Sequence, residues 1–273
     1  MKISTKTKEF EIANDKEITF IVGPCVIESR EFALETAGFL KDLFDNLGAN
    51  FIYKSSFDKA NRSSVNSFRG LGIDEGLSIL AEVKNKYDIP VLTDVHDIDQ
   101  IDRVASVVDY IQTPAFLCRQ TDFIKKVSQT NLPVNIKKGQ FMSPLEMENV
   151  LKKAISTGNK NISLCERGTT FGYGNLVVDM RGLAIMKNFG NPVIFDATHS
   201  VQLPGMAGDA SSGQREFVET LAMAATAVGI AGIFIESHPN PDLAPCDGPN
   251  MVPFRGLKNL ISRIMDIDNL IKS

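Results

Sequence analysis

The chain has 273 residues, 43% of them hydrophobic and 23% charged, which is an ordinary composition for a globular protein. Its 29 basic and 33 acidic residues give a formal net charge of −4, which argues against a nucleic-acid partner held by a general basic surface. The apolar stretches are shorter than the 18 or so residues of a membrane helix, and residues 1–17 alternate charge with polarity. We therefore expect no membrane span and no secretion signal, and predict a cytoplasmic protein.

Short apolar runs alternate along the chain with stretches that repeat hydrophobic residues at helical spacing. The runs predict eight strands, at residues 18–22, 51–54, 91–94, 110–112, 134–137, 162–166, 193–197 and 232–236. Each is followed by a polar loop and a helical stretch, most clearly at 31–47, 74–85, 144–156, 215–228 and 257–271. Strand, loop and helix repeat without a linker-like segment, which predicts one α/β domain over residues 1–273.

The predicted strands are continuously apolar, as is typical of parallel strands covered on both faces. Eight parallel strands in about 250 residues predict a TIM (β/α)8 barrel, and a doubly wound open sheet with the same local pattern stays an alternative at this point. Ahead of the first strand, residues 10–13 and 17–20 flank Asn14 and Asp15. We expect residues 1–17 to form an N-terminal β-hairpin that caps the bottom of the barrel.

Polar and ionisable residues follow all eight predicted strands, at the end where a TIM barrel builds its active site. In chain order they include Glu28, Lys54, Ser55, Ser56, Asp94, His96, Gln112, Lys137, Lys138, Gln140, Glu166, Arg167, Asp196, His199, Glu236 and His238. Chance would scatter such residues over both ends of the strands. Their placement at one end favours an enzyme pocket over a structural or purely interacting domain.

The cations at this end form an excess in a chain that is acidic overall. They are Lys54, Lys59, Arg62, Lys137, Lys138 and Arg167. Arginine offers a planar fork to phosphate or carboxylate and lysine a point charge, so we expect a substrate with more than one anionic group. Lys54 and Lys137 directly end apolar strands and are interpreted as functional, whereas Lys138 is interpreted as a solvated loop residue. A Schiff-base aldolase is an alternative, although nothing in the sequence singles out one lysine for a lowered pKa.

A closed barrel would also bring possible metal ligands together at this end. Cys25 follows the first strand, which neighbours the eighth, and His199 and His238 follow the seventh and eighth strands near Glu236 and Asp247. Thiolate, imidazole and carboxylate together suit a divalent transition metal, and the alternative is a buried packing role for Cys25. The four cysteines (Cys25, Cys118, Cys165 and Cys246) form no CxxC pair, and we expect all of them to be free thiols, with packing roles for the last three.

Three further features belong to the same end of the barrel. His96 is either a proton carrier or a residue that orients Asp94. Residues 168–174 lack the GxGxxG and GK[ST] patterns of phosphate loops, so we interpret them as a flexible site loop. The glycine- and serine-rich residues 205–213 predict a mobile loop that covers the site.

Long motifs through nearly the whole chain resemble one enzyme family. They are GPC with ES at 23–29, YKSSFDKANRSS from Tyr53, QTPAFLCRQTD from Gln112, KKGQF from Lys137, ERGTTFGYGNLVVDMR from Glu166, FDATHSVQLPG from Phe195 and FIESHP from Phe234. The family is 3-deoxy-D-manno-octulosonate 8-phosphate synthase, also called 2-dehydro-3-deoxyphosphooctonate aldolase. The resemblance implies a TIM barrel, a homotetramer, and condensation of phosphoenolpyruvate with D-arabinose 5-phosphate for the lipopolysaccharide inner core.

The resemblance also implies roles for individual residues. Lys54, Lys59, Lys137 and Arg167 would hold the phosphate and carboxylate of phosphoenolpyruvate, and they form the implied catalytic set with Asp94 and His199. Asn61, Arg62 and Ser63 would receive the pentose phosphate, with Ser56, Gln112 and Gln202 as further substrate-binding residues. Arg119 would reach across a subunit interface toward a neighbour's sugar phosphate.

Members of this family that use a metal carry cysteine at the position of Cys25, where the others carry asparagine. The resemblance therefore implies a divalent ion such as Fe, Zn or Mn on Cys25, His199, Glu236 and Asp247. Residues 246–249 instead look like the loop of metal-independent members, which leaves the identity and strict need of the metal open. The alternatives for function are a related synthase that takes erythrose 4-phosphate and a non-catalytic barrel that binds phosphosugars.

Overall fold

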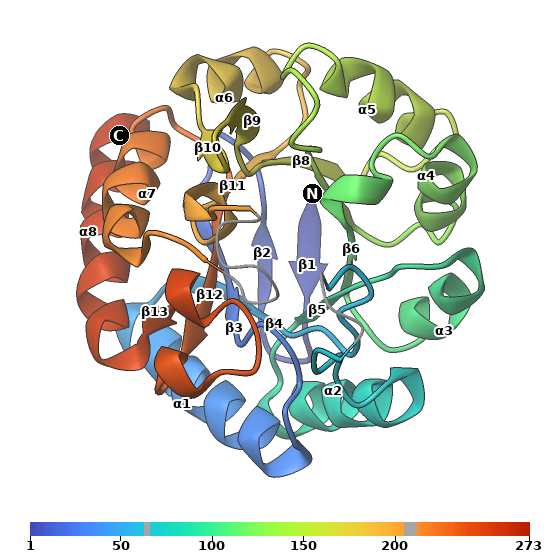
Figure 1. The fold of residues 1–273 in the computed structure, drawn as a ribbon, viewed down its shortest axis with the longest axis vertical. Helices are drawn as coiled ribbons and strands as arrows, with labels where there is room; N and C mark the ends of the chain where they lie inside the picture. Colours follow the sequence, from blue (N-terminus) through green and yellow to red (C-terminus); the bar gives the residue numbers. More distant parts are fainter. Residues whose placement is uncertain (63–65, 205–211) are drawn as a thin grey trace.

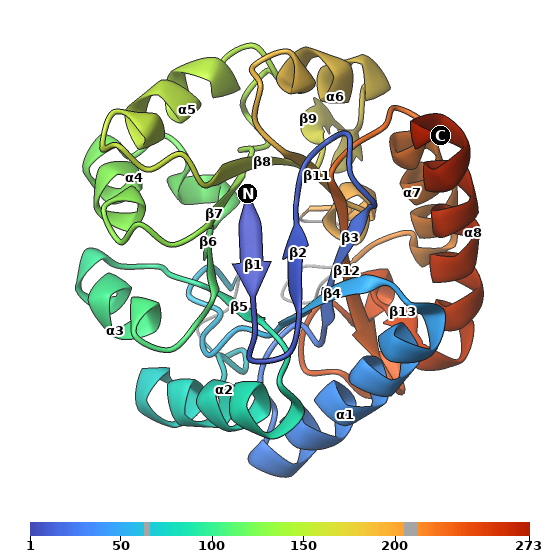
Figure 2. The same ribbon diagram turned by 180° about the vertical axis from the view of Figure 1, so that it is seen from behind.

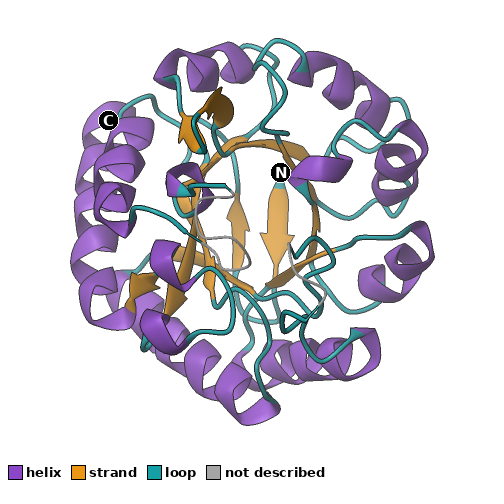
Figure 3. Ribbon diagram, viewed as in Figure 1, coloured by secondary structure: helices purple, strands orange, loops and turns teal. Residues whose placement is uncertain are grey.

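The fold is a closed barrel of eight parallel strands ringed by helices (Figures 1 and 3). The structure, a computed structural model, describes residues 1–62, 66–204 and 212–273. The barrel strands are β3 (Thr19–Gly23), β4 (Asn50–Lys54), β5 (Val91–Asp94), β6 (Tyr110–Thr113), β7 (Val134–Lys137), β8 (Ile162–Glu166), β11 (Val193–Asp196) and β12 (Gly232–His238). Strand β12 pairs with both β3 and β11 and so closes the sheet. The predicted TIM barrel is confirmed, and the open sheet is excluded.

Helices connect the strands and cover the outside of the barrel. They are α1 (Arg30–Leu47), α2 (Ile73–Tyr87), α3 (Ile101–Ala105), α4 (Thr121–Ser128), α5 (Met147–Ile155), α6 (Met180–Lys187), α7 (Val218–Thr226) and α8 (Phe254–Lys272). Helix α1 begins after Ser29, whose side chain accepts a hydrogen bond from the backbone N–H of Phe32, and it ends at Gly48 in the left-handed conformation. The apolar faces of the helices pack on the strands as one continuous core.

The N-terminal hairpin is present, but its turn is not where the sequence suggested. Strands β1 (Lys2–Ser4) and β2 (Glu9–Glu11) pair antiparallel and lie across the barrel when it is seen from behind (Figure 2). The turn lies between them, at residues 5–8, and Asp88 accepts hydrogen bonds from the side chains and backbone of this turn. Asn14 instead bonds to Asn191 and Val193 at the start of β11, and so fixes the hairpin to the bottom of the barrel.

The inside of the barrel is built in two layers. Toward the bottom, the hairpin packs on side chains that the strands point inward, including Ile52, Leu92, Ile194 and Phe234. Two positions along the same strands come Lys54, Asp94, Asp196 and Glu236, which face the same way because side chains alternate along a strand. An apolar floor thus lies beneath a charged layer at the C-terminal ends of the strands.

Gly23 stands where β3 enters the charged layer. A Cβ atom at this position would lie 2.0 Å from the backbone carbonyl oxygen of Lys54. Only glycine allows β3 and β4 to approach this closely, which keeps Lys54 at its place in the barrel.

The two predicted loops have different outcomes. Residues 168–174, predicted as a flexible site loop, belong to an antiparallel hairpin of β9 (Thr169–Gly172) and β10 (Asn175–Val177), whose turn holds Tyr173 and Gly174 at positive φ. The flexibility of this hairpin stays a prediction. Of the predicted loop 205–213, residues 205–211 lie outside the described residues. The short strand β13 (Val252–Pro253) pairs with the end of β12. Among the described residues, helices long and apolar enough to cross a membrane are absent.

Candidate active site

One cavity at the C-terminal ends of the strands gathers most of the predicted site residues. Its volume is about 240 Å³. The predicted residues that line it are Lys54, Lys59, Asn61, Arg62, Asp94, Gln112, Lys137, Arg167, His199, Gln202, Glu236 and Asp247. Among the described residues, five lysine and arginine side chains and three carboxylates line this cavity, an excess of two positive charges in a chain whose formal net charge is −4.

Glu236 is shared by two of the lysines. The Lys54 ammonium, 1% exposed, lies 2.5 Å from Glu236 Oε1 and donates to the backbone carbonyl of Cys25 at 3.0 Å. Lys59 lies 3.7 Å from the same carboxylate oxygen. Burial lowers the pKa of Lys54 to about 8, although Glu236 opposes this effect. Lys54 is therefore mainly charged at neutral pH and can hold an anion.

Asp196 connects Lys137 to His199. Lys137 Nζ lies 2.5 Å from Asp196 Oδ2 and 3.8 Å from the centre of the Phe234 ring in the apolar floor. The Nδ1 atom of His199 lies 2.8 Å from Asp196 Oδ2, an arrangement in which Nδ1 carries the proton and Nε2 is left to accept. Burial lowers the pKa of His199, but Asp196 and Glu236 outweigh that effect and leave this pKa above its ordinary value.

Arg167 follows β8, which lies between β7 and β11, and lines the same cavity. One of its terminal nitrogens donates to Gln202, and Gln202 donates in turn to Asp247 Oδ1 at 3.2 Å. The other terminal nitrogen, Nη1, is buried and has no hydrogen-bond partner among the described residues. A buried guanidinium with an unmatched donor predicts an anionic ligand at this position.

Asp94 is held as a carboxylate. It accepts a hydrogen bond from Ser56 and lies 2.8 Å from His96 Nε2. Burial raises the pKa of Asp94, but His96, Lys59 and Lys54 together hold this pKa well below its ordinary value. His96 thus contacts Asp94 directly and lines the cavity beside it, whereas Ser56 is buried behind Asp94. Gln112 accepts from Asn135 at 3.0 Å.

Other predicted substrate residues lie at the rim or apart from the cavity. Asn61 is exposed at the rim, and Arg62 donates to the carbonyl of Pro245 at 3.5 Å. Arg119 is exposed and lines a separate, shallow depression next to helix α4. Ser63 lies outside the described residues.

The interpretation of Lys138 as a solvated residue is wrong. Its side chain is 0% exposed and lies 3.3 Å from Glu166 Oε1, and it also donates to the carbonyls of Met142 and Gly168 and to the Thr169 hydroxyl. Glu166 in turn accepts from the backbone N–H groups of Arg167 and Gly168. The pair therefore joins the loops that carry Lys137 and Arg167.

Lys138→Met should destabilise the fold, since it leaves the Glu166 carboxylate and two carbonyls buried without their donor. We expect the free energy of unfolding to fall by about 3 kcal/mol, measured by urea denaturation. Lys160→Met, at an exposed position, serves as the control and should change this free energy by less than about 0.5 kcal/mol. Equal stability of the two variants would contradict the assignment.

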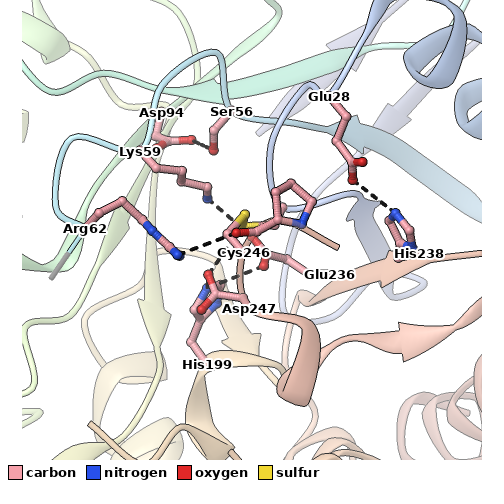
Figure 4. The surroundings of a disulfide bond; sticks show 12 residues. Glu28, Ser56, Lys59, Arg62, Asp94, His199, Glu236, His238, Cys246 and Asp247 are labelled. Carbon is pink, nitrogen blue, oxygen red and sulfur yellow. Dashed lines mark hydrogen bonds and ion pairs between the residues drawn. A yellow bond between two sulfur atoms is a disulfide. The ribbon is translucent and has the colours of Figure 1, made fainter. Parts of the chain in front are cut away.

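The expectation of four free thiols is wrong for one pair. The structure joins Cys25 and Cys246 in a disulfide (Figure 4). Cys118 and Cys165 are free and buried. The reason is the closure of the barrel: the loop after β12 returns to the end of β3 and brings the two Cα atoms to 6.5 Å, across 221 residues of sequence. In this state the Cys25 sulfur is not a free thiolate.

The remaining metal-ligand candidates fit a divalent ion. Ligand atoms of His199, Glu236 and Asp247 lie within 4.8 Å of one another. His199 Nε2 faces Glu236 Oε2 at 3.7 Å and Asp247 Oδ2 at 3.9 Å. Glu236 Oε2 is buried and accepts no hydrogen bond from the residues that the structure describes, which is the state expected of a ligand atom. By contrast, His238 turns away to Glu28 (Figure 4).

Three residues of the site have partners that the sequence did not predict. Asp196 binds both Lys137 and His199, Glu166 pairs with Lys138, and Cys246 pairs with Cys25. Asp196 was detectable in principle, because it ends a barrel strand three residues before His199. The pairing of Glu166 with Lys138 depends on how the ends of the neighbouring strands β7 and β8 meet, and that of Cys246 with Cys25 depends on closure of the barrel.

Comparison with known proteins agrees with this geometry. A sequence model of the DAHP synthetase I family matches residues 1–273, and the chain belongs to this family. Among its curated relatives is the 2-dehydro-3-deoxyphosphooctonate aldolase of Francisella tularensis subsp. novicida, 59% identical over 98% of both chains. The enzymes of the same name from Azoarcus sp. and Methylococcus capsulatus are 61% and 56% identical and cover 97% and 99% of this chain and 95% and 98% of their own. The resemblance read from the motifs is thereby confirmed.

Proposed function

We propose that this protein condenses phosphoenolpyruvate with D-arabinose 5-phosphate and water, giving 3-deoxy-D-manno-octulosonate 8-phosphate and phosphate, a step toward the lipopolysaccharide inner core. The observation that carries the proposal is the convergence of Lys54, Lys59, Lys137 and Arg167 on one cavity, with Arg167 Nη1 buried and unmatched. The name shared by relatives that are 56–61% identical supports the same reaction.

The residues can be assigned to parts of the reaction. Lys54, Lys59, Lys137 and Arg167 hold the phosphate and carboxylate of phosphoenolpyruvate over the apolar floor, and Asn61 and Arg62 receive the pentose phosphate at the rim. Ser63, which lies outside the described residues, is assigned to the same phosphate by the resemblance alone. Carbon C3 of the enol phosphate then attacks the aldehyde of the open-chain sugar, water adds at C2, and phosphate leaves by C–O cleavage. The cations offset the repulsion between two anionic substrates and stabilise charge that develops in the transition state.

The geometry around Lys54 favours anion binding over a Schiff base. Its ammonium is paired with Glu236 and bonded to the carbonyl of Cys25, so the amine is not directed at a carbonyl substrate. Of the implied catalytic set, Asp94 and His199 can accept or hold a proton beside the reacting carbons.

The deciding experiment measures phosphate release on mixing phosphoenolpyruvate with each of two sugars. We expect release and a product of the mass of the eight-carbon sugar acid phosphate with arabinose 5-phosphate, and much slower release with erythrose 4-phosphate. Faster turnover of the four-carbon sugar would assign the protein to the alternative synthase. Absence of release with both sugars from reduced, metal-loaded protein would identify a non-catalytic, phosphosugar-binding barrel.

The pKa of Lys54 predicts the alkaline side of the pH profile. Because that pKa is lowered to about 8 and the charged form binds the anion, kcat/KM for phosphoenolpyruvate should fall as pH rises through about 8 in the free enzyme. Bound phosphoenolpyruvate favours the charged form, so kcat should fall only at higher pH. Lys54→Arg keeps the charge and should move the fall in kcat/KM upward. A flat profile to pH 9.5 would contradict this role for Lys54.

A divalent metal ion is part of the proposal. His199, Glu236 and Asp247 would hold it, with Cys25 as a fourth ligand when its thiol is reduced. When bound, such an ion supplies polarisation of the pentose aldehyde or orientation of the attacking water. Gln202 joins these ligands to the anion site, since it contacts both Arg167 and Asp247.

We also infer a cytoplasmic homotetramer. Large apolar side chains are exposed on the loops after β6, β7 and β8, namely Phe116, Phe141, Leu145, Phe171 and Tyr173. Their concentration on neighbouring loops supports burial against another copy of the chain, where the exposed Arg119 would face a neighbour's site. Light scattering coupled to size exclusion should give four times the mass of the chain.

A further inference from the structure

The disulfide between Cys25 and Cys246 lies directly beside the metal-ligand candidates. Cys25 Sγ is 3.3 Å from Asp247 Oδ2. Asp247 belongs to two overlapping groups whose ligand atoms lie within 4.8 Å of one another: one with Cys25 and Cys246, the other with His199 and Glu236. The sulfur of Cys25 can therefore either bond to Cys246 or donate to an ion that His199, Glu236 and Asp247 hold, but it cannot do both.

We propose that Cys25 and Cys246 are a redox-modification site that controls metal binding, an inference that rests on the proposed metal-dependent function. A hydroperoxide supplies the oxidant. Its O–O bond breaks as the two thiols lose two electrons and two protons, so that hydrogen peroxide leaves as two waters and the S–S bond forms. A dithiol reverses the step by thiol–disulfide exchange. Oxidation removes the thiolate of Cys25 from the ligand set, and reduction restores it.

Contacts independent of the sulfurs hold both cysteine loops in place. The Cys25 carbonyl accepts from Lys54 at 3.0 Å. Arg62 points toward the loop of Cys246 (Figure 4), where the carbonyl of Pro245 accepts from it at 3.5 Å. Opening the disulfide therefore need not displace the loops, and the thiol of Cys25 stays beside Asp247. Cys25 and Cys246 are 1% and 3% exposed, so a small oxidant such as hydrogen peroxide is favoured over a protein thiol.

A reversible disulfide between Cys25 and Cys246 also agrees with the predicted cytoplasmic location of the protein. Disulfides in reducing compartments are mostly transient and redox-sensing, and they are not permanent cross-links. The other two cysteines, Cys118 and Cys165, are buried and free. They should stay free thiols on oxidation and so serve as an internal control when thiols are counted.

The test loads the reduced full-length protein with Zn²⁺ without oxygen, treats half with hydrogen peroxide, and desalts both samples. Alkylation with mass spectrometry counts free thiols and maps the linked peptides, and elemental analysis gives bound zinc. We expect oxidised protein to have two free thiols, a Cys25–Cys246 link and at least about tenfold weaker zinc binding, because losing a ligand costs no less than losing an outer-shell partner. Dithiothreitol should restore both measurements.

Two variants separate the outcomes. Cys246→Ser removes the partner thiol, so peroxide should form no link to Cys25 and zinc should be retained, whereas Cys118→Ser should respond as the unmodified protein does. Zinc binding that is unchanged in the linked form, or a link between other cysteines, would overturn the redox proposal alone. A reduced protein that binds no zinc would overturn it together with the metal site, and phosphate release from that same sample would show that the proposed reaction stands without a metal.

Discussion

Replacing Lys137 with alanine is expected to lower kcat/KM for phosphoenolpyruvate by at least about a hundredfold, the size of effect seen when one positioned charge or donor is removed from an active site. The ammonium of Lys137 lies in the charged layer above Phe234 and is paired with Asp196. Its removal takes away an anion contact and leaves the buried Asp196 carboxylate without one of its two partners. His199, which contacts the same carboxylate, would then be oriented less well.

Two controls make this result specific. Lys160→Ala removes an exposed lysine and should leave kcat/KM unchanged. Lys137→Arg keeps the charge in a different shape and should lose less activity than alanine. Circular dichroism and thermal unfolding establish that the variants are folded. Kinetics of Lys137→Ala equal to those of the unmodified enzyme would refute the assignment of Lys137 to the anion site.

Chelation is expected to abolish turnover, and an added divalent ion is expected to restore it. The experiment requires reduced protein, because the disulfide withholds one of the four proposed ligands. Binding of the ion to His199 Nε2 displaces a proton when the imidazole is charged, so metal loading should weaken as pH falls. Undiminished activity in a sample shown by elemental analysis to be metal-free would refute the metal requirement.

A pair of histidine variants tests the ligand set itself. His199→Gln should lose metal content, since it removes the nitrogen that faces Glu236 and Asp247. His238→Gln is the matched control, because His238 follows the same strand as Glu236 yet contacts Glu28 outside the cavity. Equal metal content in the two variants would contradict the role of His199.

The barrel and the position of its site could be predicted because they depend on local patterns. Continuous apolar runs and helical periodicity indicated eight strand–helix units, and the C-terminal ends of parallel strands must meet at one end of a closed barrel. Lys54 and Lys137 were recognisable since each ends an apolar run, and the structure brings both into one cavity with Arg167.

The errors arose where a partner lies far away in the sequence. Lys138 differs from Lys137 by one position, which turns its side chain away from the barrel interior and toward Glu166 at the end of β8. The hairpin turn at residues 5–8 has weaker turn-forming residues than Asn14 and Asp15, but Asp88 supplies its hydrogen bonds. The link between Cys25 and Cys246 likewise depends on closure of the first strand against the last.

The hairpin beneath the apolar floor closes the bottom of the barrel. The cavity lies at the opposite, C-terminal end of the strands, where Asn61 and Arg62 are nearer the surface than the buried Lys137 and Arg167. A sugar phosphate already bound at this rim would obstruct the passage of phosphoenolpyruvate to the more deeply buried cations. With the substrates placed as proposed, we expect ordered binding, in which the enol phosphate binds first and the pentose phosphate second.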